Sequence, residues 1–102
     1  MSTIIDDNIN ADNDSFLYYL HEENTFHVEK LIDLCTYINA LDCISIINVK
    51  RLYFIENQAI RHIAYHFDPN DCSEISNLPD NYWDYIDTLD YAINNIEIII
   101  SI

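Results

Sequence analysis

Four aspartates recur at intervals of three or four residues near the end of the chain: Asp80, Asp84, Asp87 and Asp90. On a helix, side chains at these intervals lie about 5–6 Å apart on one surface, and no Lys or Arg follows Asp80 to offset the charge. A carboxylate row at this pitch can bind Arg and Lys side chains that another protein presents to phosphates. Tyr91 shares this face and Trp83 lies at its edge, and both rings can stack on guanidinium groups. A solvated helix face is the alternative.

The acidic surplus is confined to the two ends of the chain. The protein has 102 residues, with 18 Asp and Glu against 4 Lys and Arg, and its net charge is -14. Residues 1–25 and 68–102 hold acidic residues and no basic ones, whereas residues 26–67 are balanced. This charge disfavours direct binding to nucleic acid or to an anionic membrane, because phosphates would be repelled. It favours a basic partner protein.

The histidines and other reactive side chains form no recognisable catalytic or metal motif. His62 and His66 are spaced i, i+4 and could hold a metal with His21 and His27 if they lie on a helix, but no Cys pair or Glu-x-x-His motif supports such a site. The chain has no Gly, which excludes phosphate-cradling loops, the nucleophile elbow and the EF-hand. We therefore predict no cofactor, no metal and no enzyme activity.

The cysteine pattern indicates reduced thiols. Cys35, Cys43 and Cys72 are odd in number and form no CxxC pair. The first residues lack the basic start and apolar run of a signal peptide. We expect mostly buried, structural thiols in a cytoplasmic protein that has no membrane span.

Helical periodicity identifies three segments that position these side chains. Asp14-Ser15 can cap a short helix through Leu20, and Asn24-Thr25 can cap a helix over 26–41. Leu78-Pro79-Asp80 opens the clearest helix, with Asp80 as its cap. The apolar stripe of that helix consists of Tyr82, Ile86, Leu89, Ala92, Ile93 and Ile96.

The remaining segments are more strand-like. Residues 43–49 are β-branched and predict a strand, and the apolar tail 96–102 predicts a central strand buried on both faces. Residues 50–67 fit either a helix, by period, or a hairpin that turns at Glu56-Asn57-Gln58, by composition; we predict the hairpin. The expected fold is therefore α+β, with helices packed on a short, mainly antiparallel sheet, and an all-α bundle is the alternative. Residues 1–13 are expected to be a mobile acidic segment before one globular domain, 14–102.

One segment resembles a known inhibitor family. Leu78-Pro79-Asp80-Asn81-Tyr82-Trp83-Asp84-Tyr85-Ile86-Asp87-Thr88-Leu89 is similar to the Leu-Pro-x-Tyr-Tyr-Gly-x-Asn-Leu-Asp-Ala-Leu segment of barstar-like ribonuclease inhibitors, which plugs a basic nuclease active site. Tyr82 and Asp87 match inhibitory positions. Asn81 replaces a tyrosine, Trp83 replaces the glycine, and Tyr91 stands where a second inhibitory aspartate would be. The resemblance implies a mode of action and no fold.

These observations predict an acidic inhibitor that occludes a basic, nucleic-acid-processing protein, most concretely an immunity protein that neutralises a nuclease toxin. The predicted contact residues are Asp80, Tyr82, Trp83, Asp84, Tyr85, Asp87, Asp90 and Tyr91. A phage anti-defence protein that mimics DNA, such as an anti-CRISPR or anti-restriction factor, is the first alternative. A metal-binding module or an enzyme is the second. A DNA mimic would compete with duplex DNA for a large DNA-binding machine, whereas an immunity protein would bind one cognate toxin.

Overall fold

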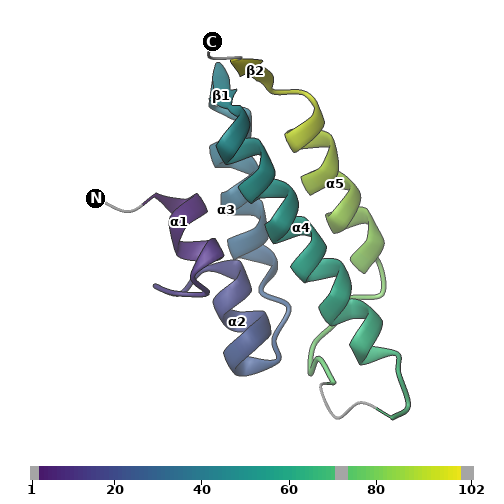
Figure 1. Cartoon of the computed structure of the whole chain (residues 1–102). Helices are drawn as coiled ribbons and strands as arrows, with labels where there is room; N and C mark the ends of the chain where they lie inside the picture. The colour runs from purple at the N-terminus through teal and green to yellow at the C-terminus, as the bar shows by residue number, and fades with distance from the viewer. Residues whose placement is uncertain (1–2, 71–73, 100–102) are drawn as a thin grey trace.

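The computed structural model describes residues 3–70 and 74–99, and these form an elongated helical domain with extents of 47 × 27 × 23 Å (Figure 1). Along the chain, the described elements are α1 (Ile4–Ile9), α2 (Phe16–Glu23), α3 (Val28–Asn39), β1 (Cys43–Ser45), α4 (Ile46–His66), α5 (Tyr82–Asn94) and β2 (Glu97–Ile99). The long helix α4 runs between the α1–α2 pair and α5, so it contacts all three.

The N-terminal segment that was expected to be mobile contains α1. Thr3 caps this helix in a capping box: its hydroxyl accepts the Asp6 backbone N–H, and the Asp6 carboxylate accepts the Thr3 N–H. Ile5 is buried in the core. Asn8 is also buried, where its side-chain amide donates to the Ile4 carbonyl at 2.9 Å and its oxygen accepts the Leu17 N–H at 3.0 Å. The bond within α1 orients the Asn8 side chain, and the bond from Leu17 ties α2 to α1.

Two of the predicted helices are confirmed, α2 with the expected start and α3 with a corrected one. Ser15 caps α2 as expected, by accepting the Tyr18 N–H. The predicted cap Asn24-Thr25 is wrong, because Asn24 instead ends α2 in the left-handed conformation, with φ of 48°. His27 caps α3, since its Nδ1 accepts the Lys30 N–H at 3.3 Å.

The predicted hairpin over residues 50–67 is wrong, because this segment lies in the 21-residue helix α4. The predicted strand over 43–49 is correspondingly short: β1 ends at Ser45, whose hydroxyl caps α4 by accepting the Asn48 N–H. Leu52, Ile55, Ala59 and Ile63 are buried at helical spacing. The helical spacing of the apolar residues was the correct indicator, and the strand-forming side chains were not. One apolar face of α4 packs against the other helices, which stabilises the helix.

The sheet is parallel, so the predicted mainly antiparallel sheet is wrong. β1 pairs with β2 in the register Cys43↔Glu97, Ile44↔Ile98 and Ser45↔Ile99, and α4 and α5 form the crossover between them. The predicted burial of the tail on both faces is also wrong, because Ile98 and Ile99 are 45% and 50% exposed. Residues 100–102 of that predicted strand lie outside the described residues.

The apolar core lies along the helices and explains why the two short strands suffice. Side chains from all five described helices contribute to it, and the largest fully buried ones are Phe16, Leu17, Leu20, Phe26, Leu31, Leu34, Ile38, Leu52, Ile55 and Leu89. A two-stranded sheet alone would be marginal, so helix packing stabilises this fold. The prediction of a small single domain that combines helices with a short sheet is confirmed.

Candidate protein-binding face

The orientation of α5 follows from its apolar stripe. Ile86, Leu89, Ala92 and Ile93 are buried against α3 and α4, so the opposite side of α5 faces solvent. Figure 1 shows α5 at one edge of the domain, with α4 beside it. The helix begins after Asn81, which makes no side-chain capping bond; the predicted cap, Asp80, lies one residue too early.

Five of the predicted contact residues recur at intervals of one or three residues along the outer side of α5. We call Trp83, Asp84, Asp87, Asp90 and Tyr91 the acidic face. Trp83 and Tyr91 are 51% and 71% exposed, large values for aromatic rings. Asp84 and Asp87 are exposed, whereas Asp90 is half-buried where α5 meets α4. Exposed aromatic rings beside carboxylates form the kind of surface that anchors protein partners.

The other three predicted contact residues lie apart from this face. Asp80 is exposed in the turn before α5. Tyr82 and Tyr85 are half-buried and pack toward the core. The ring of Tyr82 lies 5.6 Å from that of Phe67, and the ring of Tyr85 lies 6.0 Å from that of Phe26. These two tyrosines hold α5 on the domain, which positions the acidic face.

No Lys or Arg side chain in the described part of the chain forms an ion pair with the acidic face. Within residues 3–70 and 74–99, the one ion pair joins Arg51 on α4 to Asp6 on α1. The Asp6 carboxylate also accepts the Thr3 N–H, and these contacts lower its pKa. No described Lys or Arg forms an ion pair with the carboxylates of α5. Like charges one helical turn apart destabilise a helix by a few tenths of a kcal/mol per pair.

Sequence reasoning missed a further carboxyl group, Glu56, which lies on α4 beside the acidic face. Only 8% of its surface is exposed. Burial, a side-chain hydrogen bond with Asp90, and the charges of Asp90 and Asp87 raise the pKa of Glu56 to about 7. Its Oε2 has no hydrogen-bond partner among the described residues. Glu56 therefore keeps its proton to a higher pH than an exposed glutamate does, and its carboxyl group lies beside that of Asp90 where α4 meets α5.

A short hydrogen-bond chain fixes the Asp90 side of this pair. The Asn94 amide donates to Asp90 Oδ2 at 2.9 Å, and the hydroxyl of Tyr53 on α4 donates to the Asn94 oxygen. The helical alternative for residues 50–67 would have placed Glu56 next to the apolar stripe and so indicated a buried carboxyl group. The predicted hairpin placed Glu56 in a turn, where a glutamate is expected to be exposed.

The histidines are spread over three separate contacts. His62 Nε2 lies 3.1 Å from His21 Nδ1, and the two rings pack edge to face. His66 accepts the Ile75 N–H through Nδ1 at 2.9 Å, and His27 caps α3. In the part of the chain that the structure describes, no three His, Cys, Asp or Glu side chains are grouped as metal ligands would be.

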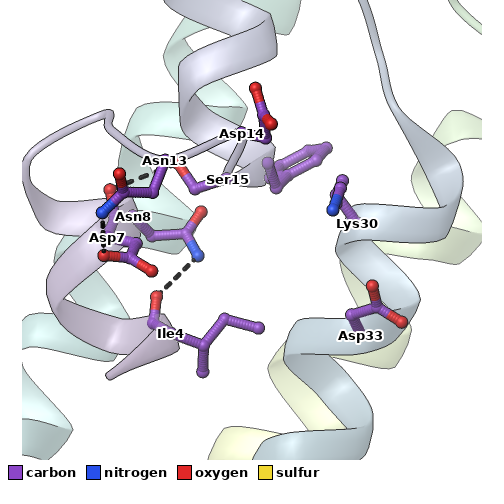
Figure 2. A pocket seen from close by; sticks show the side chains of 9 residues that line it. Ile4, Asp7, Asn8, Asn13, Asp14, Ser15, Lys30 and Asp33 are labelled. Carbon is purple, nitrogen blue, oxygen red and sulfur yellow. Dashed lines mark hydrogen bonds between the residues drawn. The ribbon is translucent and has the colours of Figure 1, made fainter. Parts of the chain in front are cut away.

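A polar hollow of about 260 Å³ lies between α1, the α1–α2 loop and α3 (Figure 2). Asp7, Asp14, Lys30 and Asp33 line it with their side chains. Figure 2 shows hydrogen bonds on the α1 side of the hollow: the Asn13 amide donates to Asp7 at 2.9 Å, and the Asn8 amide donates to the Ile4 carbonyl. These bonds hold the loop, so we assign the hollow a structural role.

The cysteines differ in exposure, so the expectation of a buried thiol is met by Cys35 and is wrong for Cys43. Cys35 is buried and Cys43 is exposed, and both are free. Burial raises the pKa of the Cys35 thiol to about 11. Cys72 lies outside the described residues. Among those residues, no helix has the length and apolar character that crossing a membrane requires.

Comparison with known proteins gives no relative from which a function can be transferred. No protein family, curated protein or solved structure matches this chain. The similarity to barstar-like inhibitors therefore stays a prediction from one segment. The functional argument rests on the acidic face and the Glu56–Asp90 pair.

Proposed function

We propose that this protein is an acidic inhibitor that binds a basic, nucleic-acid-processing protein through the acidic face of α5. An immunity protein that neutralises a nuclease toxin is the concrete form of this proposal. The observation that carries it is that Asp84 and Asp87 are exposed and form no ion pair with a described Lys or Arg, beside the exposed rings of Trp83 and Tyr91.

Inhibition by this face is occlusion. The carboxylates take the place of nucleic-acid phosphates and bind the partner's Arg and Lys side chains, while Trp83 and Tyr91 stack on guanidinium groups. The net charge of -14 steers the encounter, so association is fast at low salt and slows as salt screens the charges. Asp80 extends the acidic surface at the start of α5.

The resemblance to barstar-like inhibitors supports this mode of action at one of its two matched positions. Asp87 is exposed on the acidic face, as a residue that enters a nuclease site must be. Tyr82 is half-buried against Phe67, so we assign it to positioning α5 and not to contact. The analogy therefore concerns carboxylates that occupy phosphate-binding sites, and the aromatic contacts of this protein come from other residues.

Charge reversal on the acidic face tests the proposal. The wild-type protein and the double variant Asp84→Lys/Asp87→Lys are used as bait in lysate of the source cells, and the captured protein is purified and assayed for nuclease activity. We expect the wild type to capture a basic protein and to inhibit it stoichiometrically. The double variant is expected to weaken binding by at least about 100-fold, because two close charge pairs become repulsive.

The matched control is Glu22→Lys/Glu23→Lys, which changes net charge equally on α2. Both glutamates are exposed, and in the described residues α2 makes no contact with α5. The control should lower the association rate while leaving most of the affinity, because long-range steering depends on total charge. Equal affinity of wild type and the α5 variant contradicts the proposal. Competition by duplex DNA for a large DNA-binding assembly would identify the DNA-mimic alternative.

A further inference from the structure

We infer that the Glu56–Asp90 pair is the subsite for one arginine side chain of the partner. The inference rests on the proposed function and names the chemistry of its central contact. It concerns the inner edge of the acidic face, where α5 meets α4.

The first observation is a buried carboxyl oxygen with no hydrogen bond. Glu56 is more than nine-tenths buried, and its Oε2 has no partner among the residues that the structure describes. Leaving such an atom ionised and unsatisfied costs about 1–3 kcal/mol or more. A proton on Glu56, whose pKa is raised, reduces this cost in the free protein, and a cation would remove it.

The second observation is that every charged group that acts on Glu56 is acidic. Asp90 and Asp87, both on α5, raise the pKa of Glu56, and none of the four Lys and Arg side chains lowers it. Tyr53 and Asn94 hold Asp90 in place through neutral hydrogen bonds. A positive charge that stabilises the carboxyl groups of Glu56, Asp87 and Asp90 would therefore have to come from another molecule.

The shape of the cluster favours a guanidinium group. No three metal-ligating side chains gather in the described part of the chain, so the pair falls short of a metal site. A guanidinium group has five N–H donors in a plane and can bond two carboxylates at once.

The proton makes this contact depend on pH. An arginine bound at the pair favours the ionised carboxylate, so binding releases the proton that Glu56 holds. With the pKa of Glu56 at about 7, its ionised fraction rises about tenfold between pH 6 and pH 8. Affinity is therefore expected to rise by up to about tenfold over this range and then to level off.

Calorimetry with a defined probe tests the inference. Synthetic nona-arginine and nona-lysine peptides are titrated into the full chain at low salt, in two buffers of different protonation enthalpy, which gives the number of protons released. We expect wild type to release a proton on binding nona-arginine, to bind nona-lysine more weakly, and to gain affinity from pH 6 to pH 8. Glu56→Gln should bind about tenfold more weakly at pH 8, without that proton release or pH dependence.

The controls separate this inference from the proposed function. Glu97→Gln removes one exposed carboxylate on β2 and should leave proton release unchanged, whereas Asp90→Asn should abolish it. Equal proton release by wild type and Glu56→Gln, with binding still lost in Asp84→Lys/Asp87→Lys, overturns the arginine subsite and leaves the inhibitor proposal standing. If wild type binds neither peptide at low salt, both fail. Circular dichroism of each variant establishes that it is folded.

Discussion

Replacing Glu56 by glutamine should stabilise the free protein, and the gain should grow with pH. Glu56 is buried between α4 and α5, and its pKa is raised to about 7 by burial and by its hydrogen bond with Asp90, followed by the charges of Asp90 and Asp87. A glutamine has nearly the same shape, and its amide donates a hydrogen bond to Asp90 as the protonated acid does. It cannot ionise, so it keeps this bond at every pH.

The direction follows from the protons that the two states bind. An unfolded glutamic acid ionises with a pKa near 4.5, so between pH 4.5 and pH 7 the native state of wild type holds a proton that the unfolded state has lost. Stability therefore falls as pH rises through this window and levels off above pH 7. With these two pKa values, the loss between pH 5 and pH 8 is about 2.5 kcal/mol.

Urea denaturation at pH 5, 6, 7 and 8 measures this difference. The stability gained by Glu56→Gln over wild type should increase by about 2.5 kcal/mol from pH 5 to pH 8, which corresponds to a shift of about 1–2 M in the urea midpoint. Any pH dependence that the two proteins have in common cancels in the difference. Glu97→Gln, at an exposed position on β2, should show no such trend. A difference between Glu56→Gln and wild type that is independent of pH refutes the assignment of Glu56 as a buried acid with a raised pKa.

Two further predictions concern the N-terminal helix and the thiols. Asn8→Ala should destabilise the protein by about 2 kcal/mol in urea denaturation, because it removes a part-buried hydrogen bond at 2.9 Å to Ile4 and a buried one at 3.0 Å from Leu17; wild-type stability in this variant would show that α1 does not depend on them. In native protein at pH 8, iodoacetamide should modify Cys43 much faster than Cys35, as read by peptide mass spectrometry, because Cys43 is exposed while Cys35 is buried with its pKa raised to about 11. Equal rates would contradict the packing of α3.

Local signals in the sequence were sufficient for the helices whose apolar residues recur at helical spacing. Ser15 identified the start of α2, and the stripe that includes Ile86 and Leu89 identified α5. Helix starts were less predictable where the cap is an unusual residue, as with His27 of α3. A histidine nitrogen that accepts a backbone N–H is outside the common set of Ser, Thr, Asp and Asn caps.

The parts of the fold that depend on distant contacts were not predictable. Residues 50–67 contain strand-forming side chains, and the decision for a helix comes from burial against α1, α2 and α5. The pairing of β1 with β2 joins segments separated by two helices, and no local pattern specifies that direction. The exposed half of the candidate site was predictable from the spacing of Asp84 and Asp87, whereas Glu56 becomes its neighbour through tertiary packing alone.

The Glu56–Asp90 pair is expected to affect both the free energy of unfolding and the affinity for a cationic partner. In the free protein, the ionised Glu56 carboxylate and the neighbouring like charges on α5 lower the stability of the fold. The single substitution Glu56→Gln removes one of these charges and is expected to restore much of that stability. A group that destabilises the free state and would be satisfied by a cation makes binding more favourable by the same free energy, because the bound state lacks the penalty. Glu56→Gln is therefore expected to raise stability and lower affinity for arginine together. A variant that gained stability and kept its affinity would show that the buried acid serves the fold in some other way, and would separate it from the acidic face.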